Sequence, residues 1–220
     1  MGAIAYYFVY AILWSISILP FPILYFLSDC IYFLLYKVIG YRKKTVRYNL
    51  KITLPHLSDE ERLKIEQNFY HHLCDMFLEM AKTLTISEDE MKKRYRFTNL
   101  EVVKEFEKKN KSIILMTPHY ASWEWVIILG KFIDYKGFGI YKKLSNPRFD
   151  KLVRDMRSKF DAELISTKET VKKIKENQSI NIHGIYLFLS DQTPNLRKGL
   201  QWEYFLGHEV PVDMGADNLD

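Results

Sequence analysis

The sequence predicts an α/β protein in which a largely parallel sheet is flanked by helices and preceded by an apolar helical anchor. No side chain from Met1 to Ser28 is charged, which is typical of a segment buried in lipid or protein. From Ser112 onward, short apolar runs alternate with helical ones, which favours a repeating β-α series. The 220 residues suffice for one sizeable core with an appended helical element. We therefore expect an anchor over residues 1–40 and one α/β domain over residues 41–220.

The anchor is expected to contain two different helices. A helix from Gly2 to Leu19 would rise about 27 Å, close to the roughly 30 Å hydrocarbon core of a bilayer, and it ends before Pro20 and Pro22. This predicts one transmembrane span. The run 23–39 carries Asp29 and Lys37, so it better suits a helix at the membrane interface or packed on the body. A buried N-terminal helix of a soluble protein is the alternative.

Net charge and short sequence motifs restrict the classes of function open to this chain. Arg42, Lys43, Lys44 and Arg47 follow the anchor, which predicts that the rest of the chain is cytoplasmic. The formal charge of +5 favours anionic partners without choosing among them. Two cysteines give no disulfide framework, and the motifs of elbow-type hydrolases, P-loop enzymes and dinucleotide binders are absent from the sequence. The cluster at residues 71–75 lies on an expected helix (59–84), where we predict no metal site.

The β-α series defines a sheet edge. Strands are expected at 112–116, 138–141, 163–166 and 185–190, with helices at 123–133, 147–160 and 167–177 between them. Three helix starts carry capping signals, namely Ser58 with Glu61, Asn146 with Pro147, and Ser166 with Glu169. Ligands of open α/β sheets gather beyond the carboxyl ends of the strands. Those ends are expected to carry Pro118 and His119, Lys142 and Lys143, Ser166, and Asp191 with Gln192.

His119 and Glu124 are the candidate catalytic pair. His119 leaves the first strand and Glu124 enters the next helix, so a short loop could fold the carboxylate onto the imidazole. Such a histidine takes a proton from an alcohol while the carboxylate fixes its tautomer. Chance spacing of a histidine and a glutamate is the alternative interpretation.

Three further positions are candidates for binding substrate. Arg157 lies at the edge of the apolar stripe of its helix, where it either binds a carboxylate or phosphate or covers the core. Asp191 and Gln192 follow the last strand, where they either contact substrate or cap a turn.

Four segments together resemble one known family. They are PHYASWE (118–124), NPRFDKLVRDMR (146–157), SDQ (190–192), and FLG (205–207) followed by VPVDMGADNL. In this order behind an apolar N-terminus, they resemble the late acyltransferases of lipid A biosynthesis, the lauroyl and myristoyl transferases of the lysophospholipid acyltransferase superfamily. The resemblance implies a glycerolipid acyltransferase-like fold on the cytoplasmic face of the bacterial inner membrane.

The resemblance also implies a reaction and roles for residues. The family moves a fatty acyl chain from acyl carrier protein, or sometimes acyl-CoA, to a hydroxyl of a lipid A precursor, with no metal or organic cofactor. The family's motif is a histidine, four residues and a glutamate (HX4E). At the matching positions of this chain, His119 would be the base and Glu124 its partner. Arg157 would position substrate, Asp191 and Gln192 would form part of the wall, and Lys142 would suit an acidic carrier or lipid phosphate.

This chain departs from the family at particular positions. Ala121 and Ser122 stand where relatives usually have glycine and asparagine, and Asp161 stands where a glycine is common. Relatives continue beyond the position of Asp220, so we expect a domain truncated at its C-terminus. A lysophospholipid or aminolipid acceptor, and a membrane-tethered lipid-binding protein without catalysis, are the alternative functions. A nucleic-acid partner is not expected, because the basic residues are scattered over helices.

Overall fold

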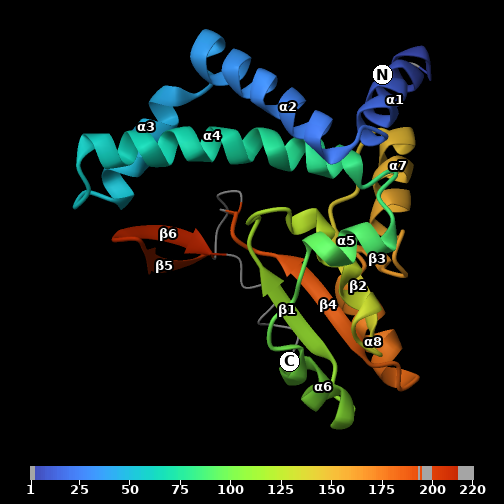
Figure 1. Cartoon of the computed structure of the whole chain (residues 1–220). Helices are drawn as coiled ribbons and strands as arrows, with labels where there is room; N and C mark the ends of the chain where they lie inside the picture. The colour runs from blue at the N-terminus through green and yellow to red at the C-terminus, as the bar shows by residue number, and fades with distance from the viewer. Residues whose placement is uncertain (1–2, 193, 195–199, 213–220) are drawn as a thin grey trace. The chain divides into compact units, whose positions relative to one another are not determined.

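The computed structural model describes residues 3–192, 194 and 200–212, and their contacts group into two units (Figure 1). The first unit comprises residues 1–9, 86–202 and 211–220, and the second comprises residues 10–85 and 203–210. The predicted α/β class is confirmed by a parallel four-stranded sheet with helices. The predicted division at residue 40 stays a prediction. Residues 213–219, which end the fourth family-like segment, lie outside the described residues.

The sheet belongs to the first unit and has the strand order β1-β4-β2-β3. All three pairings are parallel. Each predicted strand and helix of the β-α series is present, with ends that differ by a few residues. The elements are β1 (Ile113–Thr117), η2 (Trp123–Lys131), β2 (Lys136–Tyr141), α7 (Pro147–Arg157), β3 (Glu163–Ser166), α8 (Thr170–Ser179) and β4 (Gly184–Leu189), preceded by α5 (Glu88–Arg94) and α6 (Leu100–Lys108).

Side-chain alternation gives the sheet two apolar faces. On one face, Ile185 of β4 packs with Leu129 and Ile133, joined by residues of α6. On the other face, Ile174 of α8 packs with Phe138 and with residues of β3 and β4. Neighbouring residues of a strand point to opposite faces, so the central strands β2 and β4 lie between the two layers. Both layers hold the carboxyl ends of the strands in place.

Two predicted helix starts are confirmed and one is wrong. The Asn146 side chain accepts from the backbone N–H groups of Arg148 and Phe149, and Ser58 forms a full capping box with Glu61. The expected box at Ser166 is absent from the described contacts, because Ser166 ends β3 and α8 begins only at Thr170. The Ser166 hydroxyl instead donates to the Glu169 carboxylate within the turn. The helix after β1 is a 3₁₀-helix rather than an α-helix.

The second unit is mainly helical. Its elements are α2 (Phe21–Tyr32), the π-helix η1 (Phe33–Ile39), α3 (Lys43–Thr53) and α4 (Asp59–Lys82); α1 (Ala3–Ser17) begins in the first unit, and the hairpin β5 (Gln201–Phe205) with β6 (His208–Val212) has residues in both. Helices α2 and η1 pack along α4 and run antiparallel to it (Figure 1). Contacts join Tyr25 to Glu79, Tyr32 to His71 and Tyr36 to Glu66.

The helix lengths bear on the expected anchor. Among the described residues, helix α1 has 15 residues and rises only about 22 Å, less than the hydrocarbon core, and the transmembrane span at residues 2–19 stays a prediction. The Lys82 ammonium donates to the Ser17 and Leu19 carbonyls where this helix ends. Phe21–Ile39 is instead long and apolar enough to cross a membrane, judged by length and composition only.

A buried carboxylate joins three helical segments of the second unit. Glu66 is 1% exposed, and its carboxylate accepts from the Tyr36 hydroxyl at 2.9 Å and from Arg47 Nε at 2.8 Å. Burial raises the pKa of the Glu66 carboxyl, but the hydrogen bonds from Arg47 and Tyr36 outweigh it and hold the pKa below its ordinary value.

This carboxylate predicts an acid-sensitive contribution to stability. A depressed pKa stabilises the fold above the unfolded carboxyl value of about 4.3, and this contribution is lost as pH falls through the folded value. We expect Glu66→Gln to lower the free energy of unfolding by about 1–2 kcal/mol at neutral pH and by less near about pH 4. Thermal unfolding in detergent would measure this, with the exposed Glu105→Gln as control. An equal loss at both pH values would contradict it.

Candidate active site

The carboxyl ends of β1 and β4 bring His119 and Asp191 together. These strands are paired so that Thr117 lies opposite Leu189, and each functional side chain follows two residues later. The Asp191 carboxylate accepts from the His119 backbone N–H at 2.9 Å, and its other oxygen lies 2.6 Å from Nδ1 of the imidazole. One carboxylate therefore fixes both the loop and the ring.

This contact corrects the predicted pairing. Among the described contacts, His119 is paired with Asp191 rather than with Glu124. The physical reason is strand order: β1 and β4 are neighbours, whereas Glu124 has already entered η2 and points to α7. Burial raises the pKa of the Asp191 carboxyl, but its hydrogen bonds with the His119 side chain and backbone, and the attraction to His119, hold it below the ordinary value.

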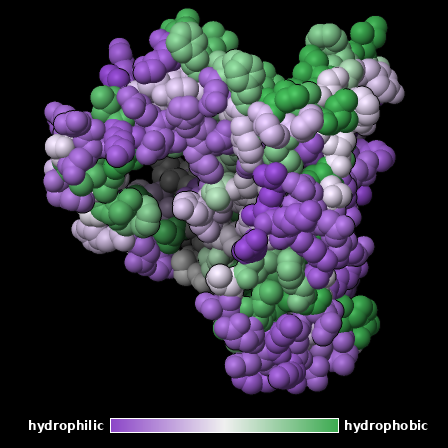
Figure 2. Space-filling view, viewed as in Figure 1, coloured by the Kyte–Doolittle hydropathy of each residue, from purple (hydrophilic) through white to green (hydrophobic). Residues whose placement is uncertain are grey.

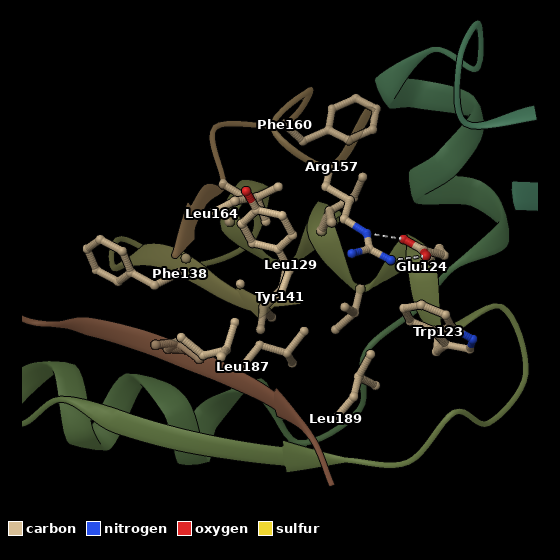
Figure 3. Close-up of a pocket in the computed structure, with 18 of the residues that line it drawn as sticks. Trp123, Glu124, Leu129, Phe138, Tyr141, Arg157, Phe160, Leu164, Leu187 and Leu189 are labelled. Carbon is tan, nitrogen blue, oxygen red and sulfur yellow. Dashed lines mark hydrogen bonds and ion pairs between the residues drawn. The ribbon is translucent and has the colours of Figure 1, made fainter. Parts of the chain in front are cut away.

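Glu124 and Arg157 form a second pair. Arg157 Nε donates to Glu124 Oε2 at 2.8 Å, and its terminal nitrogen contacts the other carboxylate oxygen (Figure 3). The Glu124 side chain is 10% exposed and that of Arg157 is 22% exposed. Two parallel contacts to a planar guanidinium make a charge-assisted fork with fixed geometry. The partner predicted for the half-buried arginine therefore exists, and it is Glu124.

Trp123 connects the two pairs. Its ring meets the His119 ring edge to face, with centroids 4.7 Å apart, and the Arg157 guanidinium lies 5.4 Å from its centroid. Both distances fall in the ranges for aromatic and cation–π contacts. A tryptophan at this position keeps the imidazole and the guanidinium in a fixed relation.

A cavity of about 620 Å³ opens beside these side chains. It is lined by four predicted site residues, His119, Lys142, Arg157 and Gln192, as well as by Trp123 and several apolar residues. The structure thus brings together side chains from the ends of β1, β2, α7 and β4. Asp191 and Glu124 do not line the cavity, but they contact His119 and Arg157, which do. The roles of all six residues remain proposals.

Trp123 and Tyr141 are site residues that sequence reasoning missed. Both line the 620 Å³ cavity, and the Tyr141 side chain is buried at the end of β2. Tyr141 directly precedes Lys142, so its place at a strand end was a usable signal. The signal for Trp123 was its position next to Glu124 in an otherwise apolar helix.

The loop between His119 and Glu124 contains a strained residue. Ala121 has a φ of 51°, in the left-handed region that costs an L-residue roughly 1–2 kcal/mol. Asp161, the other position where the sequence resemblance implies a glycine, has a φ of 68°. The backbone at both positions therefore has a conformation that favours glycine.

We expect Ala121→Gly to raise the free energy of unfolding by up to about 1 kcal/mol. Relief of the left-handed strain exceeds the entropy that glycine adds to the unfolded chain. Thermal unfolding would detect this. The matched control is Ala81→Gly within α4, which should be destabilising because glycine is a poor helix former. A lower melting temperature for Ala121→Gly would contradict the strain.

Comparison with known proteins identifies the family. Residues 2–207 match the family described as bacterial lipid A biosynthesis acyltransferase. The chain belongs to this family. It is 26% identical over 153 residues to "Lipid A biosynthesis acyltransferase 2" of Shigella flexneri, which covers 70% of this chain and 48% of that relative. In Escherichia coli (strain K12), "Lipid A biosynthesis lauroyltransferase" is 23% identical over 167 residues (74% and 53%).

A third relative gives the same picture. "Lipid A biosynthesis myristoyltransferase" of Escherichia coli (strain K12) is 22% identical over 146 residues, which is 66% of this chain and 45% of the relative. The chain spans about half the length of the curated relatives it matches. The resemblance seen in the sequence is confirmed at the level of the family.

Proposed function

We propose that this chain is an O-acyltransferase that moves a fatty acyl chain from acyl carrier protein to a hydroxyl of a lipid A precursor. The observation that carries the proposal is the His119–Asp191 pair at the edge of a parallel sheet, beside a 620 Å³ cavity, in a member of the lipid A acyltransferase family. Asp191 binds Nδ1, so Nε2 of the neutral imidazole is left to accept a proton.

The reaction follows from that tautomer. Nε2 of His119 takes the proton of the acceptor hydroxyl as its oxygen attacks the thioester carbonyl carbon. The tetrahedral intermediate then collapses, the carbon–sulfur bond breaks, and the imidazolium returns the proton to the leaving thiolate. Asp191 stabilises the imidazolium between the two steps. The products are the ester and the thiol of the carrier, and no cofactor enters.

Charges around the cavity suit anionic substrates. Glu124 neutralises Arg157, so this pair contributes a rigid wall rather than a free cation. Lys142 is exposed, lines the cavity, and makes no ion pair with any residue that the structure describes. A lysine ammonium is a mobile point charge suited to a phosphate of the lipid or of the carrier's prosthetic arm. We assign Lys142 that contact and Gln192 a hydrogen bond to the acceptor.

The second unit supports attachment to the inner membrane through α2 and η1. One side of this segment packs on α4, and the opposite side exposes apolar residues (Figure 2), namely Ile23, Phe26, Phe33, Leu34, Val38 and Ile39. Helix α4 begins with Asp59, Glu60 and Glu61 and carries charges along its length, so it cannot accompany α2 through a bilayer. We therefore propose that Phe21–Ile39 lies in the interface, with the catalytic residues on the cytoplasmic face.

Acyl transfer to defined acceptors would test the function. We expect the purified chain in detergent to convert acyl carrier protein thioester and a lipid A precursor into a product heavier by one acyl chain, detected by mass spectrometry. A parallel assay with a lysophospholipid as the acceptor tests the main alternative function. Acylation of the lysophospholipid alone would replace the proposed acceptor, and binding of lipid without turnover would contradict the enzyme.

A further inference from the structure

One face of α7 carries a charged residue near each end. Asp150, Val153 and Arg157 are spaced three and four residues apart, so they share this face of the helix. Val153 and Arg157 both line the 620 Å³ cavity. Arg157 binds Glu124 of η2 at one end of the face. Asp150 lies at the other end, and it takes no part in the acyl transfer proposed above.

Asp150 ties the loop between β2 and α7 to the helix. The residue is only 3% exposed, and its Oδ1 accepts from the Leu144 backbone N–H at 2.8 Å. Asp150 lies in the first turn of α7, where the helix dipole favours a negative charge and offsets part of the cost of burying it. A carboxylate binds an N–H group about twice as strongly as a neutral acceptor does. This contact therefore holds the loop firmly.

The start of α7 is capped by another residue. The Asn146 side chain accepts from the backbone N–H groups of Arg148 at 3.1 Å and Phe149 at 3.4 Å. Pro147, at the first helical position, has no N–H group that needs an acceptor. The Asp150 carboxylate instead contacts a residue that precedes the N-cap and lies outside the helix. Asp150 therefore serves the loop rather than the helix start.

The loop holds Lys142 between two fixed points of the backbone. On one side, Tyr141 is buried in β2, and its carbonyl accepts from the Thr167 N–H at 3.0 Å. On the other side, the Leu144 N–H is held by Asp150. Lys142 and Leu144 both line the 620 Å³ cavity. The backbone of Lys142 has little freedom between these points, so its ammonium is kept at the cavity.

We propose that Asp150 is a positioning residue, which holds the β2–α7 loop so that the Lys142 ammonium meets a phosphate of the substrate. This rests on the proposed function, in which Lys142 binds that phosphate. Asp150 does not line the cavity, so its effect reaches the substrate through the loop. A lysine side chain is long and flexible, and a fixed backbone reduces the entropy that it loses on binding. Loss of Asp150 therefore weakens substrate binding more than it slows the chemical step.

Transfer kinetics of Asp150→Ala test the effect on binding. We expect one KM to rise about tenfold, the effect of losing one hydrogen bond to a charged group, while kcat stays within about twofold. A raised KM for the lipid acceptor places the phosphate on the lipid, and a raised KM for the carrier protein places it on the prosthetic arm. Asp150→Asn keeps an oxygen acceptor for the Leu144 N–H, so its KM should rise about threefold at most.

The matched control lies on the same helix. Asp155 is exposed and pairs with Lys151 at 2.5 Å, so Asp155→Ala should keep both parental KM values. A folded Asp150→Ala variant with both KM values unchanged would overturn the proposal. So would an Asp150→Asn variant as impaired as Asp150→Ala, because the contact with Leu144 needs only an acceptor oxygen.

A double variant shows whether Asp150 acts through Lys142. In a Lys142→Ala background, Asp150→Ala should raise the KM no further, because the ammonium that it positions is already absent. An equal rise with and without Lys142 would identify a residue that only stabilises the fold, and it would contradict the proposal. If Asp150→Ala does not fold, the same comparison with Asp150→Asn gives the answer.

Two measurements without turnover separate this inference from the proposed function. Amide hydrogen exchange of residues 142–146 should be at least about tenfold faster in Asp150→Ala than in the parent and unchanged in Asp155→Ala. Calorimetry compares the phosphate-bearing lipid precursor with its dephosphorylated form, and the carrier protein with the apo carrier, which lacks the prosthetic arm. Faster exchange and a loss of affinity confined to a phosphate-bearing form would support the inference even if no acyl chain were transferred, an outcome that would refute the acyltransferase alone. Unchanged exchange would refute the inference, whatever the transfer assay shows.

Discussion

Replacing His119 with alanine is expected to lower kcat/KM for acyl transfer about 10²–10⁴-fold, the range that general base catalysis contributes. Asp191→Asn should lower it at least about tenfold, because the amide cannot stabilise the imidazolium and can present the wrong hydrogen-bonding group to Nδ1. Steady-state transfer from acyl carrier protein to the lipid acceptor measures both. The Asp191 variant should lose kcat more than it changes KM, since the contact strengthens as the proton moves.

Controls separate this chemistry from general damage to the fold. His183 directly precedes the amino end of β4, whereas the site lies at the carboxyl end. His183→Ala should therefore retain the parental rate within a few-fold. Equal melting temperatures for the parent and the two site variants would show that the fold is intact. A folded His119→Ala variant with parental turnover would remove the imidazole from the mechanism.

Breaking the Glu124–Arg157 pair is expected to have the second largest effect, and on stability as well as activity. Arg157→Met should cost about 2–4 kcal/mol, because it leaves a carboxylate that is 10% exposed without its partner; the value is below that of a fully buried pair because Arg157 is partly exposed. Glu124→Gln should cost less, since the guanidinium can reach solvent and keeps one hydrogen-bond acceptor. Thermal unfolding in detergent would show which of the two variants loses more stability.

The double variant makes this prediction specific. Glu124→Gln with Arg157→Met removes both charges, so its stability loss should be smaller than the sum of the two single losses. Additive losses would show that the two side chains act independently. Transfer rates should follow the same pattern, because the pair fixes Trp123, which contacts both Arg157 and His119.

The local elements of the fold could be predicted from the sequence. Apolar runs located all four strands of the parallel sheet, and Asn146 before Pro147 marked the start of α7 because an N-cap depends only on neighbouring residues. The Ser166 prediction failed for the opposite reason. A Ser-x-x-Glu spacing also fits a turn that leaves a strand, and β3 extends through Ser166.

The partners within the site could not be predicted because they depend on strand order. The sequence distance of five residues pointed to Glu124 as the partner of His119, yet β4 lies beside β1 and supplies Asp191 across 72 positions. Likewise, Glu124 and Arg157 are 33 positions apart and meet where η2 packs near the end of α7. Residue types at strand ends were informative, whereas their pairing needed the topology.

The anchor shows a similar limit. Composition identified an apolar N-terminus, but helix length and packing decide which helix can span a membrane and which lies at its surface. The contacts of Tyr25, Tyr32 and Tyr36 with α4 place α2 and η1 along a charged helix, and no hydropathy pattern of residues 21–39 alone contains that information.

The protonation of the His119 ring tests the central claim most directly. Nitrogen-15 NMR of the histidine side chains, assigned by comparison with His119→Ala, would show which ring nitrogen carries the proton at neutral pH. We predict a proton on Nδ1, held by Asp191, and an unprotonated Nε2, with this preference lost in Asp191→Asn. A proton on Nε2 in the neutral ring, or a spectrum that Asp191→Asn leaves unchanged, would contradict the proposed base.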